Sequence, residues 1–195
     1  DMDIEIVGLV KDGKIRSYGV ALGPAIGWEA EGVKAARERD IAGMQIIYNL
    51  LEQDPGRAHI AACRAVGAAV VARVPHSSGL LEGHYTEDTV FGPNDHRRHR
   101  PRSWLTHGLR KVDQLRFLTD ARPGATLGQV ALAWVLQRAD NIVAIPGTTK
   151  LANLKQNLGA ADVKLTSAAL ARLDALAAKV KGERYDESGM KGVNG

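Results

Sequence analysis

The sequence has very little cysteine, few aromatic residues and no long apolar run. Cys63 is the only cysteine among 195 residues, which excludes an internal disulfide and a disulfide-stapled miniprotein and suits a reducing compartment. The longest apolar runs, such as 68–72 and 142–146, are too short to cross a bilayer, and no charged-then-apolar leader opens the chain. We therefore expect a cytoplasmic protein with no membrane contact.

The composition that remains suits one ordinary globular core. Hydrophobic residues make up 45% of the chain and charged residues 25%, which excludes a collagen and a wholly disordered tail. Residues 182–195 are rich in glycine and charge and show no periodicity. The sequence thus predicts one domain over residues 1–181 and a flexible tail over 182–195.

Positive charge is concentrated in one part of the chain. Between Asp95 and Arg116, seven Lys and Arg residues stand against two Asp residues. Such a cluster meets an anionic ligand or is simply a solvated loop and helix face. No stacking aromatics are interleaved with the charges, so we expect no nucleic-acid partner. His96 and His99 have metal-ligand spacing, but four neighbouring arginines disfavour a cation, so we expect no metal.

Short apolar runs alternate with longer helical patterns along the chain, which is typical of parallel βα units. Four such units make half of an eight-stranded (β/α)8 barrel, so the predicted fold class is α/β, a partial TIM barrel. The two edges of half a barrel must be covered or paired with another chain. The predicted strands are 15–21, 44–48, 68–74 and 142–145, and the predicted helices are 28–39, 55–66, 103–119, 127–137, 150–160 and 166–180.

Two local patterns sharpen this prediction. Thr126 and Gln129 are spaced as a capping box at the start of a helix, and Thr166 is placed to cap the last helix. By contrast, residues 75–102 have no periodicity and are interrupted by glycine and proline. Irregular segments of this length are usually functional or disordered.

The stretch after the fourth predicted strand has the features of an anion site. A tight turn containing Gly147 leads into a helix whose first turn carries Thr148, Thr149 and Lys150. Free backbone N–H groups, the positive end of the helix and a lysine would together attract a phosphate. The alternative is an ordinary capped connection between a strand and a helix.

Two polar residues interrupt apolar strands. Gln45 lies in the second predicted strand and Arg73 in the third. Polar side chains in such positions need partners, and these are either a ligand or other groups of the protein.

Taken in order, several segments resemble the C-terminal half of the aldo-keto reductase superfamily over residues 8–180. No single segment is specific, but their order and spacing together are. The segments are Asp12-Gly-Lys-Ile-Arg-Ser-Tyr-Gly-Val20, Gln45-Ile-Ile-Tyr-Asn49, Gly79-Leu-Leu-Glu-Gly83, Ala131-Leu-Ala-Trp-Val-Leu-Gln137, Ile145-Pro-Gly-Thr-Thr-Lys150 and Asn157.

The resemblance implies an oxidoreductase that reduces aldehydes or ketones by hydride transfer. The implied cofactor is NADP(H), with NAD(H) less expected, and the implied partner is a small carbonyl substrate. By position, the adenosine end would be held by residues 147–157, the nicotinamide amide by Gln45, and the pyrophosphate path would be lined by residues of the third βα loop. The implied cofactor-binding residues are Gln45, Arg73, Leu80, Leu81, Gly83, Gly147, Thr148, Thr149, Lys150, Asn153, Gln156 and Asn157.

Two departures from the family pattern stand close to the implied nicotinamide position. Ala21-Leu22 replaces a Ser-Asn pair, and Arg73 replaces an aromatic ring. The family's catalytic Asp, Tyr, Lys and His lie on the first four strands, which would precede Asp1, so no catalytic residue is assigned. Three readings stay open: a chain active with a preceding half barrel, a short nucleotide-binding protein that pairs its open edges with a second copy, and a degenerate fragment.

Overall fold

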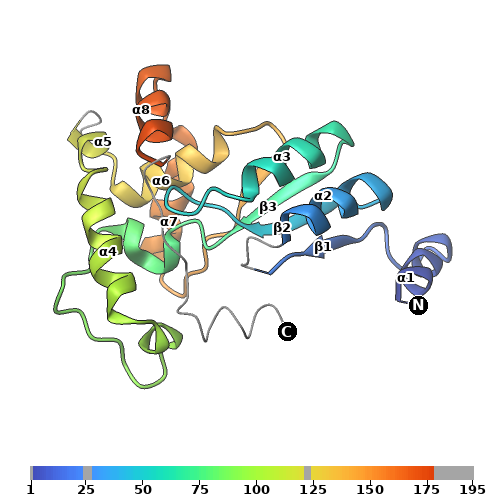
Figure 1. Ribbon diagram of the computed structural model, residues 1–195, viewed down its shortest axis with the longest axis horizontal. Helices are drawn as coiled ribbons and strands as arrows, with labels where there is room; N and C mark the ends of the chain where they lie inside the picture. The colour runs from blue at the N-terminus through green and yellow to red at the C-terminus, as the bar shows by residue number, and fades with distance from the viewer. Residues whose placement is uncertain (1, 24–27, 121–123, 178–195) are drawn as a thin grey trace.

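The computed structural model describes residues 2–23, 28–120 and 124–177. Its centre is a sheet of four parallel strands in sequence order, as Figure 1 shows. Each strand pairs only with its neighbours along the chain, so β1 and β4 are the two edges. The strands are β1 (Gly19–Ala21), β2 (Gly43–Ile47), β3 (Ala69–Arg73) and β4 (Ile142–Ala144).

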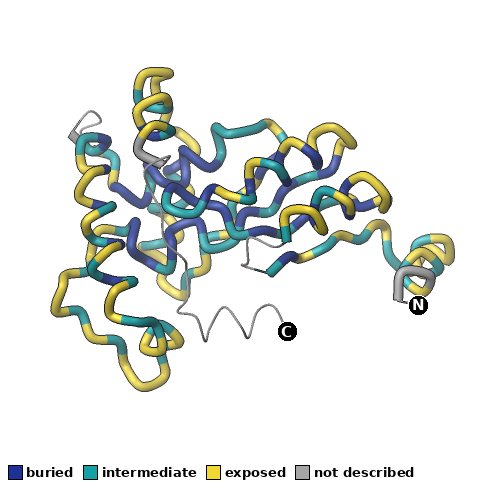
Figure 2. The backbone as a smooth tube through the Cα atoms, in the orientation of Figure 1, coloured by how far each residue is buried: buried dark blue, intermediate teal, exposed yellow. Residues whose placement is uncertain are grey.

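One face of this sheet forms the hydrophobic core. Side chains alternate between the two faces of a strand, and Met44, Val70 and Ile142 are all buried on the same face. Against this face lie the helices α2 (Trp28–Glu38), α3 (Gly56–Ala65) and α6 (Leu127–Leu136). Figure 2 shows the buried residues concentrated in the sheet and the helices beside it.

The core contains a stacked pair of buried aromatic rings. Trp134 of α6 and Tyr48, just after β2, stack with their ring centroids 5.1 Å apart. Trp134 is fully buried, as expected for a tryptophan that packs a helix against a sheet.

The opposite face of the sheet is only partly covered. On it Val71 lies in register between Gln45 of β2 and Val143 of β4. Val143 is 50% exposed and Ile145 is 46% exposed. The apolar run 142–145 predicted a strand covered on both faces, which is wrong for the described residues, because no helix or strand among them lies over this side.

Seven further elements occupy the described part of the chain after β3. Besides α6, two short 3₁₀ segments and two helices follow β3, and two helices with a third 3₁₀ segment between them follow β4 (Figure 1). They are η1 (Ser77–Glu82), η2 (His96–His99), α4 (Arg102–Asp113), α5 (Phe117–Asp120), α7 (Leu151–Leu158), η3 (Gly159–Asp162) and α8 (Ser167–Ala177).

Most predicted elements are present, with shifted ends. The capping box at Thr126 is confirmed, because its hydroxyl accepts a hydrogen bond from the Gln129 N–H and the Gln129 side chain bonds back to the Thr126 N–H. Thr166 also accepts from the Ala169 N–H at the start of α8. The first strand is shorter than predicted, and the helix predicted over 103–119 is divided into α4 and α5.

The first helix was not predicted. α1 (Met2–Lys11) lies away from the sheet in Figure 1. Its sequence is rich in β-branched residues, which favour strands over helices and hide a helical pattern. The predicted tail at 182–195 and the end of the helix predicted to reach Val180 lie outside the described residues. Among the helices that are described, none is both long and apolar enough to span a membrane.

Candidate functional site

The carboxyl ends of the four parallel strands meet at one edge of the sheet, where α/β proteins place their ligand sites. Gln45 and Arg73 both lie on the open face of the sheet near this edge and are half-buried. Arg73 reaches from β3 across the end of β2, and its Nη2 donates to the backbone carbonyl of Leu22 at 3.1 Å. Leu22 in turn donates its N–H to the Gln45 carbonyl at 2.9 Å. The structure therefore brings Gln45, Arg73 and the end of β1 together.

The turn that leaves β3 has an unusual backbone. Val74, Ser77 and Ser78 have positive φ angles of 55°, 48° and 56°, and Gly79 has a φ of 93°. Positive φ is sterically unfavourable for residues with a Cβ atom, above all for β-branched valine. Such conformations cluster at functional sites and persist only where the surroundings hold them.

A polar network from the neighbouring strand holds the first part of this turn. Asn49, just after β2, donates to the Val74 carbonyl at 3.0 Å and to Glu52 Oε2 at 2.7 Å. The same Glu52 oxygen accepts from the Ser77 hydroxyl at 3.1 Å. Asn49 is completely buried, so these bonds satisfy a side chain that would otherwise be costly to bury. The ends of β2 and β3 are thus fixed relative to each other.

The irregular segment that follows is fastened to the second part of the turn. The Tyr85 hydroxyl donates to the Ser78 carbonyl at 3.0 Å, and Arg97 donates to both of these groups. Arg100 donates to the Ser78 hydroxyl at 3.0 Å. Ser78 belongs to the turn that leaves β3, so these hydrogen bonds attach the loop over 84–100 directly to the carboxyl end of that strand.

An ion pair organises that loop. Arg97 Nη2 lies 2.5 Å from Asp95 Oδ2, and its Nε donates to Asp95 Oδ1 at 2.8 Å. Hydrogen bonds from the Arg97 side chain and backbone N–H hold the pKa of Asp95 far below its usual range. Burial raises the pKa of Tyr85, against the opposing effect of the nearby Arg97 charge. At neutral pH the loop therefore contains a carboxylate, a guanidinium and a neutral phenol.

A second titratable pair lies beneath the turn. His76 Nδ1 lies 3.3 Å from Glu82 Oε1, and His76 Nε2 lies 3.3 Å from the Gly128 carbonyl. The hydrogen bond from His76 lowers the pKa of Glu82, although partial burial opposes this shift. The pair connects η1 to the start of α6.

In the predicted anion site after β4, Thr148, Thr149 and Lys150 precede the helix instead of lying in its first turn, because α7 begins only at Leu151. β4 leads into an exposed turn, and the Ile145 N–H donates to the Ala72 carbonyl of β3 at 3.0 Å. The Thr148 hydroxyl accepts from the Lys150 N–H at 3.1 Å, and α7 begins at Leu151. The Lys150 side chain is exposed. A lysine and the positive end of a helix therefore stand at the same edge of the sheet as Arg73.

The predicted amide residues of α7 share one side of that helix. Asn153, Gln156 and Asn157 are all half-buried. Gln156 is anchored, because its Nε2 donates to the Thr126 hydroxyl at 2.8 Å and its carbonyl accepts from Gln129. Within the described part of the chain, the side chains of Asn153 and Asn157 make no hydrogen bond, so their amides are available to a ligand.

The residues predicted from the third βα loop are placed differently. Leu80 and Leu81 have their side chains buried in the core, with 2% and 0% exposed. These values include the backbone, so neither residue presents surface to a ligand in this structure. Gly83 is exposed and has a φ of 77°.

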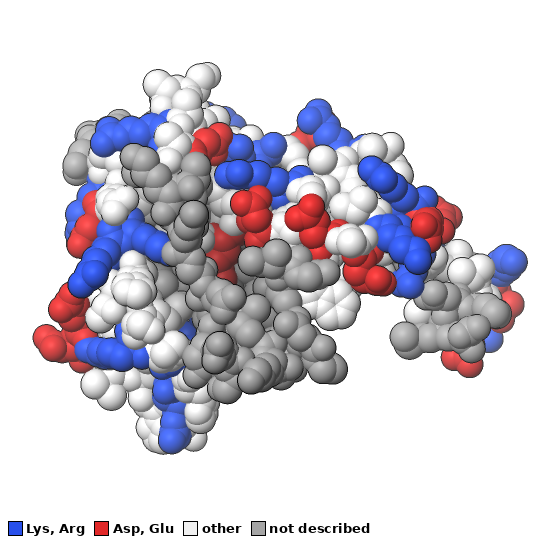
Figure 3. Space-filling model, in the orientation of Figure 1, with Lys and Arg blue, Asp and Glu red and all other residues white. Residues whose placement is uncertain are grey.

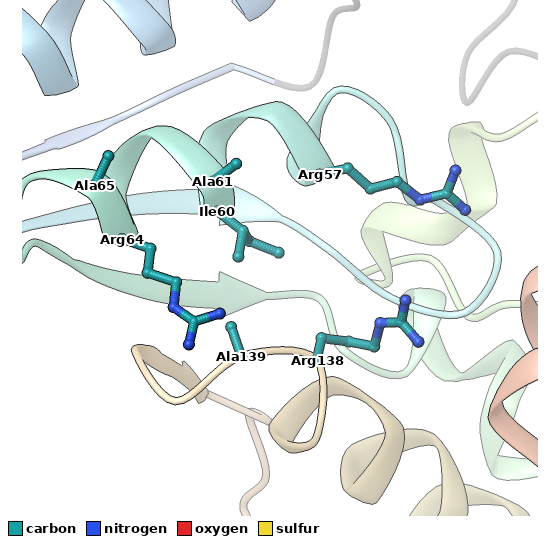
Figure 4. Close-up of a pocket in the computed structure, with 7 residues that line it drawn as sticks. All are labelled: Arg57, Ile60, Ala61, Arg64, Ala65, Arg138 and Ala139. Carbon is teal, nitrogen blue, oxygen red and sulfur yellow. The ribbon is translucent and has the colours of Figure 1, made fainter. Parts of the chain in front are cut away.

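A pocket of about 410 Å³ lies elsewhere, between α3 and the end of α6 (Figure 4). Its cations are Arg57, Arg64 and Arg138. Arg64 pairs with Asp140 and Arg138 with Asp174, at 3.3 Å and 3.1 Å, and Arg57 donates to Gln53. The pocket lies on the helix side of the sheet and none of the predicted site residues lines it. Each of its three arginines already lies within 4.0 Å of a carboxylate, Arg57 beside Asp54, so this pocket is not the candidate site.

Two of the three described tyrosines, Tyr48 and Tyr85, are not free to act as an acid. Tyr48 is 1% exposed, and burial raises its pKa. The Tyr85 hydroxyl is engaged with Ser78 and Arg97, and Tyr18 packs against the core. No group of three or more metal-ligating side chains occurs among the residues described.

Comparison with known proteins identifies the family. The model of the Aldo/keto reductase family matches residues 5–178. The chain belongs to this family. It is 34% identical over 190 residues to the aldo-keto reductase str7 of Strobilurus tenacellus, which covers 93% of this chain and 55% of that protein.

Solved structures of aldo-keto reductases share the fold. The glycerol dehydrogenase AKR11B4 of Gluconobacter oxydans has a TM-score of 0.73 at 24% identity, covering 92% of this chain and 55% of that one. An aldo-keto reductase of Klebsiella pneumoniae, solved with NADP and acetate, has a TM-score of 0.64 at 24% identity, covering 93% and 55%. The predicted α/β partial barrel is thus confirmed. The chain spans about half the length of these relatives.

Proposed function

We propose that this chain is the cofactor-binding half of an NADP(H)-dependent reductase of aldehydes or ketones. The observation that carries the proposal is that Arg73, Gln45 and the β4–α7 turn, which belong to separate βα units, lie at one edge of the sheet. Family membership supports the oxidoreductase class, and the Klebsiella pneumoniae relative was solved with NADP.

The residues of the β4–α7 region fit the adenosine end of NADP(H). Lys150 and the N–H groups of the first turn of α7 are suited to the 2′-phosphate, together with Gly147, Thr148 and Thr149. Asn153, Gln156 and Asn157 would face the adenine ring, which needs hydrogen-bond donors and acceptors rather than charge. NADPH is therefore preferred to NADH in this proposal.

The residues of β2 and β3 fit the nicotinamide end. Gln45 would bond the carboxamide, and the exposed Gly83 would follow the pyrophosphate, with the buried Leu80 and Leu81 supporting this turn from the core. The two departures from the family pattern meet here, because the Arg73 guanidinium bonds the carbonyl of Leu22. A planar guanidinium can both stack and donate, so Arg73 would supply one of the polar contacts that Ala21-Leu22 lacks.

When bound, the cofactor supplies the hydride that reduces a carbonyl group. The described residues would bind and orient it. Neither Tyr48, which is buried, nor Tyr85, whose hydroxyl is engaged, is placed to donate the accompanying proton. We propose that a complementary half barrel provides the acid.

The helix α7 indicates where such a partner would pack. Leu151, Leu154 and Leu158 lie on the side of α7 opposite its amides and are 66%, 46% and 67% exposed. Val143 of β4, an outer strand of the sheet, and Ile145 just after it add exposed apolar surface. We propose that this surface is covered by a preceding half barrel or, if there is none, by a second copy of the chain.

NADPH binding by this chain tests the proposal. Lys150→Met is expected to weaken NADPH binding about tenfold, since a charge-assisted contact is lost, and to leave NADH binding unchanged because NADH lacks the 2′-phosphate. Lys155→Met is the matched control, because Lys155 is exposed on the same helix but is not a predicted contact. Calorimetric titration measures both affinities. Equal effects of Lys150→Met on the two cofactors would refute the assignment.

The alternative is a nucleotide-binding half barrel without hydride transfer. It is favoured by the placement of Tyr48, which is buried, and of Tyr85, whose hydroxyl is already engaged. Saturable NADPH binding with no turnover of a panel of aldehydes, by the chain in its natural assembly, would establish it. The cytoplasmic location stays a prediction from the sequence.

A further inference from the structure

The loop between β3 and α4 encloses a pocket of about 200 Å³ whose lining combines cations and aromatic rings. Figure 3 shows Lys and Arg side chains around the part of the molecule that this loop occupies. Four arginines line the pocket together with Phe91 and Trp104; they are Arg97, Arg98, Arg100 and Arg102.

Two of these arginines pair with no carboxylate among the residues that the structure describes. Arg98 donates to the Pro93 carbonyl at 2.7 Å, and Arg102 donates to the Thr89 carbonyl at 2.9 Å. Carbonyl groups are neutral, so they position a guanidinium without cancelling its charge. Arg97, in contrast, is paired with Asp95. Both Arg98 and Arg102 are exposed and retain further N–H donors.

The aromatic part of the lining orients the other two arginines. The Arg100 guanidinium lies 4.6 Å from the centroid of Trp104, and that of Arg97 lies 4.9 Å from the centroid of Phe91. These cation–π contacts hold the two guanidinium groups against the aromatic rings. The donors of Arg97 are taken by Asp95, Ser78 and Tyr85, so a carboxylate would be met by Arg98 and Arg102. Val90 adds an apolar rim, with 88% of its side chain exposed.

The pocket is connected to the candidate cofactor site. Arg97 and Arg100 both donate to Ser78, which belongs to the turn at the carboxyl end of β3. A molecule in the pocket would therefore contact arginines that are themselves hydrogen-bonded to the turn at the carboxyl end of β3, the strand that carries Arg73. A cavity near 150 Å³ holds a benzene ring, so about 200 Å³ accommodates an aromatic ring with a small substituent.

We infer that this pocket binds an organic carboxylate with an aromatic body. Taken with the proposed function, on which this last step rests, the carboxylate is the distal end of the carbonyl substrate. The arginines hold its charge, while Phe91 and Trp104 contact its ring. The sequence already shows the arginine cluster, but only the fold brings it against the aromatic rings.

Binding of 4-carboxybenzaldehyde tests the inference, with its methyl ester as the uncharged counterpart. Calorimetric titration of the chain is expected to show saturable binding of the acid and at least tenfold weaker binding of the ester. The double substitution Arg98→Met/Arg102→Met is expected to weaken binding of the acid about tenfold. The charge-preserving Arg98→Lys/Arg102→Lys should stay within about threefold of the original, and Arg37→Met, on α2, should change nothing.

The NADPH affinity of the same variants separates this inference from the proposed function. Unchanged NADPH binding in the double methionine variant supports a separate carboxylate pocket, whereas an equal loss for NADPH would assign the arginines to the cofactor and overturn it. Equal binding of acid and ester, or an unaffected double variant, would also overturn it. If the acid binds through these arginines and NADPH does not bind, the pocket stands and the proposed function fails.

Discussion

Gly79 is the position at which a single methyl group should damage the candidate site most. Its φ is 93°, in the region that L-residues rarely adopt. A Cβ atom placed there would overlap the Tyr85 hydroxyl and lie 2.9 Å from Tyr85 Cζ. Gly79→Ala therefore imposes two costs, one from the backbone and one from the contact with Tyr85.

The two costs can be estimated separately. The backbone conformation costs about 1–2 kcal/mol for a residue with a Cβ atom. Displacing Tyr85 breaks its hydrogen bonds to Ser78 and Arg97, at about 0.5–1.5 kcal/mol each. A gain of about 0.4–1 kcal/mol from stiffening the unfolded chain opposes both. The net loss expected for Gly79→Ala is about 1–4 kcal/mol in the free energy of unfolding, which is large against a typical stability of about 5–15 kcal/mol.

Two other glycines serve as controls. Gly124 has nearly the same φ, 94°, but nothing lies within 4 Å of a Cβ built there, so Gly124→Ala reports the backbone cost alone. Gly147 has neither an unfavourable φ nor a close contact, so Gly147→Ala should change stability by less than about 0.5 kcal/mol. Urea denaturation followed by circular dichroism measures all three. If Gly79→Ala and Gly124→Ala destabilise equally, the packing of Tyr85 against the turn is refuted.

Two further predictions follow from the loop and from α7. Asp95 has a pKa in the folded state below its ordinary 3.8, so its contribution to stability is present above about pH 4 and is lost as the pH falls. Asp95→Asn should therefore lower the free energy of unfolding at neutral pH and make it depend less on pH in the acid range, as measured by urea denaturation. An unchanged pH dependence would contradict the pairing of Asp95 with Arg97. Leu151→Ser/Leu158→Ser should weaken association of the chain with its partner or with a second copy, as measured by sedimentation. About two-thirds of each leucine is available for burial, and burying a whole leucine is worth about 1.5–3 kcal/mol. Val90→Ser is the control, and an equal effect of the control would count against α7 as the interface.

Patterns that depend on neighbours in the sequence predicted the fold well. The alternation of strands and helices is a local signal, and so is the capping box at Thr126, which needs only a hydroxyl and an amide three residues apart. The order of strand, turn and helix around residues 147–150 was also readable, because the three elements follow one another directly, whereas the anion site itself stays a prediction. The ends of the elements were less accurate, as at β1, because pairing with β2 rather than composition decides where a strand begins.

Contacts between distant residues were not predictable from one sequence. Nothing near Arg73 indicates that its guanidinium would bond Leu22, fifty-one residues earlier. The same holds for Ser78, which accepts from Arg97 and Arg100 only because the long loop folds back on the turn. The sequence showed the arginines as a charge cluster, and the positive φ angles of the turn gave no signal beyond a single glycine.

The helix α7 buries its polar side rather than its apolar side, which its sequence pattern alone would not predict. Its leucines face outward and its amides, Asn153, Gln156 and Asn157, are the half-buried side. In a complete hydrophobic core the leucines would be inside, because their burial is worth more than that of amides. Gln156 is nevertheless held in place by Thr126 and Gln129, so the orientation is built into the fold. This arrangement supports the proposal that the leucine side of α7 meets another polypeptide and its amide side a polar ligand, the division we expect of half a barrel that binds the cofactor.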